Sequence, residues 1–202
     1  MMVRMSDHTA SPQARTRRVK KPTTIRDMFL SLAVVLVPLL LLTWLYTNNL
    51  PDYPVQAVDP APAVARARAE APYPILVPTG LPTGEGGWVV TQASWVPKGG
   101  RTRAGDAASF TNEWLWGALD LSKTYYAVNE SDDEPRRVIQ RQSREGDPDG
   151  ASTVNGRQWE RWRSPDGRTR VLVLRENGYT VTVTADASYE GLEALASTLS
   201  DH

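Results

Sequence analysis

The chain has 202 residues, with 23 basic side chains, 23 acidic side chains and no cysteine. A sequence without cysteine excludes disulfides, thiol catalysis, cysteinate metal sites and lipid attachment to cysteine. Once one long apolar stretch is set aside, the remaining length predicts a single folded domain.

The apolar stretch covers residues 28–46 and contains no charged side chain. At about 1.5 Å per residue, a helix over it spans roughly 28 Å, close to the roughly 30 Å hydrocarbon thickness of a bilayer. Trp44 and Tyr46 fall where the aromatic belt of the outer interface is expected. We therefore predict a transmembrane helix over residues 28–47 that lies in the lipid bilayer.

Charge predicts the orientation of this helix. Residues 1–27 carry seven Lys or Arg against two Asp, whereas residues 48–202 carry sixteen basic and twenty-one acidic side chains. Positive charge beside a spanning helix is retained in the cytoplasm. We interpret residues 1–27 as a disordered basic cytoplasmic tail of a single-pass cell-membrane protein, with its C-terminal domain outside. The alternative is a cleaved signal peptide, but its apolar core would be too long and residues 47–51 contain no small-x-small cleavage pattern.

Residues 48–82 are rich in proline. Proline interrupts helices and central strands, so this segment predicts an extended and stiff stalk. Within it, residues 59–71 favour a short helix, because they begin with an Asp-Pro pair, contain good helix formers and are followed by another proline. The extracytoplasmic domain is then expected over residues 83–202.

The first strands of this domain are indicated by β-branched and aromatic residues. Residues 88–96 predict one strand, and residues 113–129 predict two strands separated near residues 121–124. Residues 97–108, which contain glycine, arginine and lysine, are expected to form a mobile loop between them.

Three further strands are predicted over residues 157–163, 169–176 and 179–185. They are separated by Ser-Pro-Asp-Gly and Asn-Gly, two sequences that favour tight turns, so we expect an antiparallel meander. In the last strand three threonines alternate with larger apolar residues. This alternation predicts one buried face and one face in contact with solvent.

Two short helices complete the expected α+β domain. The first has Asp132 or Asp133 as its cap and Pro135 in its first turn, and residues 146–150 are expected to end it. The second covers residues 188–199 and has an apolar stripe at helical spacing. We expect the second helix to cover the apolar face of the meander, which makes an antiparallel sheet packed with short helices.

Catalytic chemistry is restricted by the residues that the domain does not contain. The only histidines are His8 in the predicted tail and His202 at the C-terminus, so a Ser-His-Asp triad and a histidine-ligated zinc site are excluded. The only lysines of the domain, Lys98 and Lys123, have no serine three residues before them, which excludes a Ser-x-x-Lys site. We expect no enzymatic activity, no metal and no cofactor.

Acidic residues leave one catalytic alternative open. Two carboxylates suffice for glycoside hydrolysis, and four acidic residues are assigned to strands: Glu113, Asp120, Glu130 and Glu160. Two acidic segments are candidate calcium sites. Residues 147–150 resemble the start of a calcium loop but have glycine at the position of the required glutamate, and residues 130–134 can be explained by the helix that follows.

The candidate ligand or partner surface consists of aromatic and basic residues. Trp114 and Trp116 share one side of their strand, and that side is either exposed or part of the core. Trp159 and Trp162 lie on opposite faces of theirs, so one of them is the better candidate for exposure. With the adjacent cations, the candidate residues are Trp114, Trp116, Trp159, Trp162, Arg161 and Arg163. An envelope polymer, a lipid headgroup or a membrane protein is the expected partner, and nucleic acid is not expected outside the membrane.

Three segments resemble a known family. They are residues 71–78 (APYPILVP, followed by Gly-Leu-Pro), residues 154–161 (VNGRQWER) and residues 179–184 (YTVTVT). With the basic tail and the single anchor, they are similar to the actinobacterial membrane-anchored family of domain of unknown function 4245 (DUF4245), over roughly residues 25–199. The resemblance implies the same layout, and it transfers no catalytic residue because none is established in the family. Its members usually have a shorter loop than residues 97–108 and a glycine in place of Ala185.

These observations predict a membrane-anchored extracytoplasmic domain that binds or scaffolds a component of the cell envelope without catalysis. One alternative is a carboxylate-dependent hydrolase that acts on envelope polysaccharide. Another is a structural subunit of a membrane complex, in which the anchor rather than the domain makes the contacts.

Overall fold

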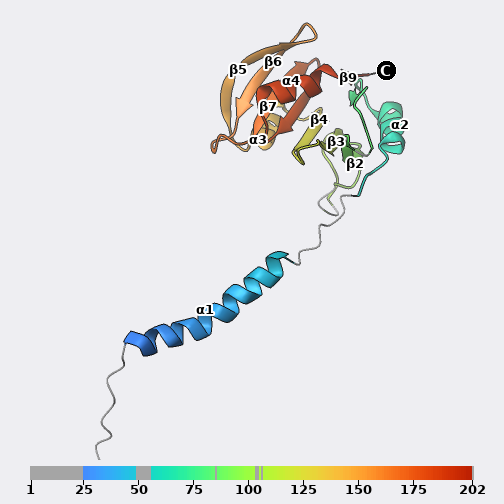
Figure 1. Cartoon of the computed structure of the whole chain (residues 1–202). Helices are drawn as coiled ribbons and strands as arrows, with labels where there is room; N and C mark the ends of the chain where they lie inside the picture. Colours follow the sequence, from blue (N-terminus) through green and yellow to red (C-terminus); the bar gives the residue numbers. More distant parts are fainter. Residues whose placement is uncertain (1–24, 49–55, 85, 103–104, 106, 202) are drawn as a thin grey trace, which may run out of the picture. The chain divides into compact units, whose positions relative to one another are not determined.

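The computed structural model describes residues 25–48, 56–84, 86–102, 105 and 107–201 (Figure 1). The chain divides into two compact units, Met1–Tyr53 and Pro54–His202, and each is described by itself. Most of the predicted tail and the start of the predicted stalk lie outside the described residues.

The described part of the first unit is one helix, α1, over Ile25–Asn48. Its segment Met28–Tyr46 is long and apolar enough to cross a membrane, and none of it is buried within the structure. The hydroxyls of Ser31 and Thr43 donate to backbone oxygens of the same helix at 2.9 and 2.8 Å. These polar groups are therefore satisfied inside the helix, as a lipid environment requires. Length and composition of this kind suit a membrane anchor and also a signal sequence.

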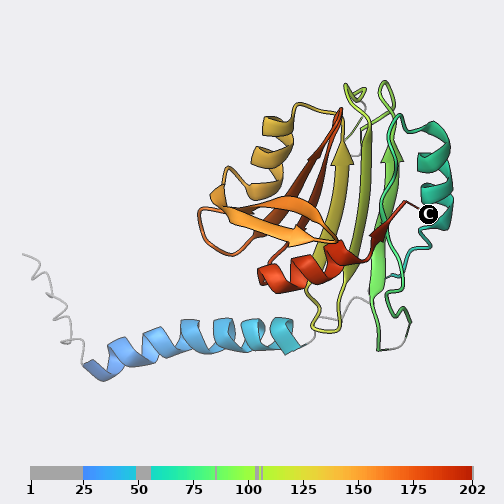
Figure 2. The same ribbon diagram turned by 90° about the horizontal axis from the view of Figure 1, so that it is seen from above.

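The second unit is built on a seven-stranded antiparallel sheet with strand order β2-β3-β4-β8-β7-β6-β5 (Figure 2). Its strands are β2 Val89–Val96, β3 Glu113–Leu119, β4 Tyr125–Ser131, β5 Asp147–Val154, β6 Arg157–Arg163, β7 Arg170–Glu176 and β8 Tyr179–Ala185. Two short strands, β1 Val77–Pro78 and β9 Leu199–Ser200, pair as a separate antiparallel ribbon. The predicted α+β class is confirmed.

One face of the sheet carries the main core. Helix α4, Tyr189–Ser197, packs on β5, β7 and β8, and helix α2, Ala61–Glu70, packs on β2. Ser188 caps α4, because its hydroxyl accepts a hydrogen bond from the backbone nitrogen of Gly191. Leu192 and Leu195 of α4 are almost fully buried. The predicted C-terminal helix and the face that it covers are thus confirmed.

Helix α3, Pro135–Ser143, packs on β7 and β8 across the opposite face. Ile139 of α3 contacts a small apolar cluster with Val171 and Val173. Thr180 and Thr182 of β8 are fully buried on this face. The prediction that the threonine face of β8 contacts solvent is therefore wrong, because a helix inserted between β4 and β5 in the chain returns over it.

The proline-rich segment is part of the folded unit, and the predicted domain boundary at residue 83 is too late. The backbone nitrogen of Val58 donates to the carbonyl of Val90 at 2.8 Å. Tyr73, Ile75 and Leu76 are buried, and β1 pairs with the C-terminal ribbon strand. The segment thus supplies one layer of the core rather than a stalk. Its helix begins two residues later than predicted, with Asp59 accepting a hydrogen bond from the nitrogen of Ala61.

Strand β5 was not predicted. Residues 147–150, expected to end a helical unit, are its first half, and its register shifts between Pro148 and Ala151. A bulge on an edge strand accommodates proline and glycine, which a central strand would not. The N-cap of α3 also differs from the predicted Asp132 or Asp133. Glu134 occupies the N-cap position, and its side chain makes no cap hydrogen bond.

Candidate functional site

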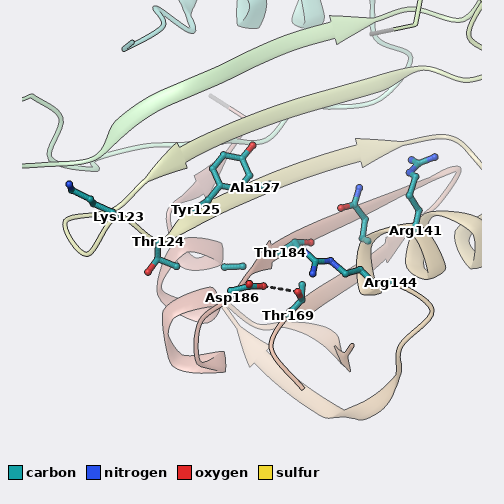
Figure 3. Close-up of a pocket in the computed structure, with 11 residues that line it drawn as sticks. Lys123, Thr124, Tyr125, Ala127, Arg141, Arg144, Thr169, Thr184 and Asp186 are labelled. Carbon is teal, nitrogen blue, oxygen red and sulfur yellow. Dashed lines mark hydrogen bonds between the residues drawn. The ribbon is translucent and has the colours of Figure 1, made fainter. Parts of the chain in front are cut away.

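A groove of about 540 Å³ lies beside α3 on the sheet face opposite α4 (Figure 3). Its floor includes the small residues Ala127 of β4 and Thr184 of β8. Lys123, Arg141 and Arg144 line it, together with one carboxylate, Asp186. We call it the α3 groove.

Two of these cations form no direct ion pair with a carboxylate of the described residues. Among the residues that the structure describes, no carboxylate oxygen lies within the 4.0 Å ion-pair distance of Lys123 or Arg144. Arg141 differs, because its guanidinium lies 3.4 Å from Glu113 and 3.9 Å from Asp133. The groove therefore presents two cations whose charge is not neutralised by direct ion pairs.

The carboxylate of the groove is already engaged by the protein. Asp186 accepts a hydrogen bond from the Thr169 hydroxyl at 2.6 Å and lies 3.6 Å from the Arg168 guanidinium. Figure 3 shows the hydrogen bond between Thr169 and Asp186, and Arg144 lines the same groove. The charge of the Asp186 carboxylate is thus partly offset by Arg168, which leaves an excess of positive charge in the groove.

Both unpaired cations occupy backbone positions that suit glycine. Lys123 has φ 61° and Arg144 has φ 57°, in the left-handed region that costs an L-residue roughly 1 to 2 kcal/mol. Asp120 closes the turn around Lys123, since its carboxylate accepts from the nitrogens of Ser122 and Thr124 at 2.8 Å each. Arg144 is the C-cap of α3, where glycine is the common residue. Local backbone geometry alone would favour glycine at both positions.

Tyr125 forms another wall of the groove and lies across the neighbouring strand. Its hydroxyl donates to the Gln92 side chain on β2 at 3.1 Å, so the ring passes over Gly117 of β3. A Cβ added at Gly117 would lie 2.1 Å from the Tyr125 hydroxyl oxygen. Glycine at position 117 is therefore required for the ring to lie flat against the sheet and shape this side of the groove.

The lining of the groove is polar and contains more cations than carboxylates. Its cations, the Tyr125 ring and the threonine hydroxyls suit an anion, and the buried hydroxyl oxygen of Thr184 has no hydrogen-bond partner among the described residues. Within the described part of the chain, no three His, Cys, Asp or Glu side chains gather in a way that could hold a metal ion. Asp132, from one of the acidic segments considered for calcium, instead bonds the backbone and side-chain nitrogens of Asn112 at 2.7 and 2.6 Å.

The tryptophans of the predicted ligand surface are mostly core. Trp114 is fully buried, and Trp116 and Trp159 are each 2% exposed. The candidate surface that included them is therefore wrong at these three positions, because the face onto which they point is covered by helices and by the proline-rich segment. Trp114 also donates its indole nitrogen to the carbonyl of Leu76 at 3.3 Å.

The remaining predicted residues do not form one surface. Arg161 lies on the α4 face, bonded to Ser152 and Glu193 and 4.6 Å from the centre of the Tyr189 ring. Arg163 on the same face lies 3.6 Å from the carboxylate of Asp149.

Trp162 lies on the opposite face, as expected from its spacing to Trp159. It is only half-buried, packs against the cluster around Ile139, and donates its indole nitrogen to Glu160 at 3.0 Å. Trp162 also lines a second hollow on the other flank of α3.

The four predicted carboxylates do not converge. Glu113 and Glu130 lie on the neighbouring strands β3 and β4 but on opposite faces, because Glu113 is paired with Ser131 in the register. Glu160 is held by the Arg175 guanidinium at 2.7 and 3.2 Å. Asp120 is in the turn after β3 rather than on a strand.

Glu130 is fully buried in the main core. One of its carboxyl oxygens accepts a hydrogen bond from the backbone nitrogen of Leu76 at 2.7 Å, and the other has no partner among the described residues. Burial raises the pKa of the Glu130 carboxyl well above its usual range, against the opposing effect of the Leu76 hydrogen bond. Tyr73 donates its hydroxyl to the Glu130 carbonyl at 3.3 Å, so this strand anchors the proline-rich segment at two points.

Sequence reasoning missed the groove residues, because none of them belongs to a motif. Lys123 and Arg144 lie 21 positions apart in the chain, and each was assigned only to a turn or a helix end. The one signal that could have identified them is a charged residue in place of glycine where a turn or helix end is expected.

The fold and the apolar helix define the class of protein: a seven-stranded α+β domain preceded by one helix that could cross a membrane. The chain belongs to the DUF4245 family, described as proteins of unknown function, whose model matches residues 20–199. No curated protein and no solved structure matches the chain.

Proposed function

We propose that this protein is a membrane-anchored module of the cell envelope that binds an anionic ligand in the α3 groove without catalysis. The observation that carries the proposal is the pair of unpaired cations, Lys123 and Arg144, on one groove at positions where the backbone favours glycine. A charged side chain held in a strained conformation points to a role outside local folding. An envelope polymer with phosphate or carboxylate groups is the class of ligand that two such cations suit.

The anchor supports this placement. Helix α1 has the length for a bilayer, and the basic residues before it favour a cytoplasmic N-terminus, with the domain outside. An extracytoplasmic domain tethered in this way would meet envelope polymers at the membrane surface.

The hydrolase alternative has little geometric support. Glycosidases place two carboxyl groups about 5 to 10 Å apart on one site, whereas Glu113 and Glu130 point to opposite faces and Glu160 is held in a bidentate ion pair. The protein also has histidine only at positions 8 and 202. We therefore propose binding rather than turnover.

The binding test uses the full-length protein in nanodiscs of neutral lipid, titrated with dextran phosphate and with neutral dextran of the same length. We expect the phosphate polymer to bind and the neutral polymer not to bind. The double variant Lys123→Gly/Arg144→Gly should weaken binding at least about tenfold, since it removes both cations. Its thermal stability should stay unchanged or rise slightly, because glycine relieves the positive φ.

The matched control is Arg66→Ala/Arg137→Ala, which removes two exposed cations outside the groove. Equal losses of affinity in the two double variants would mean that binding depends on the overall charge of the domain. This result would reject the α3 groove as the binding site. Unchanged affinity of the glycine variant would reject it as well.

The structural-subunit alternative makes a different prediction. In that case the contacts lie in the anchor, so replacing residues 28–46 with an unrelated spanning helix would abolish association with partner proteins. Retained association after this replacement, together with loss in the glycine variant, would favour the binding module.

A further inference from the structure

One end of the seven-stranded sheet is the place where the chain enters the domain. The backbone nitrogen of Val58 donates to the carbonyl of Val90 at the start of β2. Val90 is paired with Ala118 near the end of β3. Leu119, the last residue of β3, is paired with Tyr125, the first residue of β4. The start of β2, the turn between β3 and β4 and the start of β4 therefore lie together, and we call this the entry end.

Exposed apolar side chains are concentrated at the entry end. Among the described residues of the second unit, the exposed large hydrophobic residues are Val58 (40%), Phe110 (88%), Leu121 (71%) and Tyr125 (42%). Three of these four belong to the entry end, whereas Phe110 lies at the opposite end, in the loop between β2 and β3. Apolar groups that gather at one place, unlike single scattered ones, indicate an interaction surface.

Leu121 is held at this end by a hydrogen-bonded turn. The backbone nitrogen of Asp120 donates to the carbonyl of Thr124, and that of Lys123 donates to the carbonyl of Asp120, at 3.0 Å each. Leu121 itself belongs to neither core cluster of the domain. The turn therefore presents an apolar side chain to the outside in a defined position, next to the cation Lys123.

The length of the chain before the entry end limits what this surface can meet. Nine residues, 49–57, separate the end of α1 at Asn48 from Val58. Ten steps of at most about 3.6 Å keep Val58 within roughly 36 Å of that helix end. Because α1 is the proposed membrane anchor, the bilayer is an apolar phase that stays within reach of the entry end. Its headgroup layer also supplies phosphates for Lys123.

We propose that the entry end docks on the phospholipid bilayer that holds α1, with the Leu121 side chain inserted into the headgroup layer and Lys123 beside the lipid phosphates. Ser122 stays among the hydrated headgroups. A single leucine would not hold a free domain on a membrane, but the anchor makes the contact intramolecular, so a weak contact is sufficient. This inference rests on the membrane anchor of the proposed function, not on ligand binding in the α3 groove.

The test uses the full-length protein in nanodiscs of phosphatidylcholine, a fraction of which carries a spin label on its headgroup. The chain has no cysteine, so Ser122→Cys carries a fluorescent dye at one position and keeps Leu121 and Lys123. This dye should be quenched by the spin-labelled lipid. Ala107→Cys places the same dye at the opposite end, beyond the seven residues or about 24 Å of β3, where quenching should be at least about threefold weaker.

A second substitution separates docking from the effect of the tether. Leu121→Asp in the Ser122→Cys variant should reduce the quenching at least about twofold, because a carboxylate is costly to remove from water. The matched control Phe110→Asp replaces an exposed apolar residue at the opposite end and should leave the quenching unchanged. Quenching that Leu121→Asp does not change, or that is equal at the two dye positions, would show a tethered domain without docking and overturn the proposal.

Two other outcomes would also reject docking on the bilayer. A dye at Ser122→Cys that is shielded from water but not quenched by the lipid would assign Leu121 to a contact with another protein chain. A protein that does not co-elute with the nanodiscs would reject the anchor, and the docking with it. The nanodiscs contain no anionic polymer, so a failure of polymer binding in the α3 groove would leave this measurement unchanged.

Discussion

At the scale of single residues, the ionisable groups of this domain are arranged in two ways. In one, partners lower the pKa of a carboxyl near the surface, as for Glu193, where the hydrogen bond from the Ser152 hydroxyl contributes most and Arg161 adds to the effect. Glu130 is the opposite case, because its burial in the core raises the pKa and favours the neutral carboxyl. The neutral form can still accept the hydrogen bond from Leu76 that fixes the proline-rich segment.

Glu130 predicts how stability depends on pH. Its pKa is higher in the folded than in the unfolded chain, so the folded state holds this proton more tightly. The stability that this tighter proton binding gives the folded state is fully present below the pKa of the unfolded chain, near 4.5. It is lost as the pH rises through the pKa of the folded state. The free energy of unfolding should therefore fall from pH 5 to pH 8, by up to about 1.4 kcal/mol per pH unit.

Glu130→Gln imitates the neutral carboxyl and should remove this fall. Urea unfolding at pH 5, 6, 7 and 8 measures it, with the exposed Glu145→Gln as the control that keeps the wild-type slope. Carboxyls whose pKa is lowered, such as those of Asp166 and Glu190, are present in wild type and in both variants. Their contribution therefore cancels when the variants are compared with wild type. If the free energy of unfolding of wild type and of Glu130→Gln changed with pH in parallel, Glu130 would not titrate differently in the folded and unfolded states between pH 5 and pH 8.

At the scale of elements, the proline-rich segment is the part whose role differs most from its composition. It contributes helix α2, strand β1 and the buried side chains of Tyr73, Ile75 and Leu76. Fully burying each such side chain stabilises a fold by about 1.5 to 3 kcal/mol. Together they approach the whole stability of an ordinary domain, about 5 to 15 kcal/mol.

A truncation series tests this. A chain that begins at residue 83, the boundary predicted from sequence, should lack a cooperative unfolding transition and dispersed amide resonances. A chain that begins at residue 56 should fold, because it keeps the Val58 hydrogen bond to β2 and everything after it. Cooperative folding of the shorter chain would show that the segment is a stalk after all.

The success of sequence reasoning differs between elements for physical reasons. Strands β2, β3, β4, β6, β7 and β8 and helix α4 were predicted because turn sequences and side-chain periodicity are local properties. Strand β5 was missed because Pro148 and Gly150 are tolerated only through an edge position and a bulge, which depend on the sheet. The burial of Thr182 and of Trp114 depends on which helix covers which face, and periodicity carries no information on that. The α3 groove was missed for the same reason, since Lys123 and Arg144 meet only through the tertiary fold.

At the scale of the whole molecule, the charge asymmetry and the apolar helix together predict which compartment the proposed binding surface faces. The net charge is zero, yet the first 27 residues carry seven basic side chains against two acidic ones. If this charge is retained in the cytoplasm, the α3 groove faces the envelope and can meet polymers there. In the opposite orientation the groove would face the cytoplasm and could meet only the anions there. Cleavage of the helix would release the domain from the membrane.

The lack of cysteine makes this orientation measurable, because any introduced thiol is unique. Ser6→Cys places a thiol in the basic tail, and Ser122→Cys places one in the exposed turn before Lys123. A membrane-impermeant maleimide should label Ser122→Cys in intact cells and Ser6→Cys only after permeabilisation. Labelling of Ser6→Cys in intact cells would mean the reverse orientation. Loss of the Ser6→Cys thiol from the mature chain would mean that the helix is a cleaved signal sequence, so the same pair of variants separates all three arrangements of this helix.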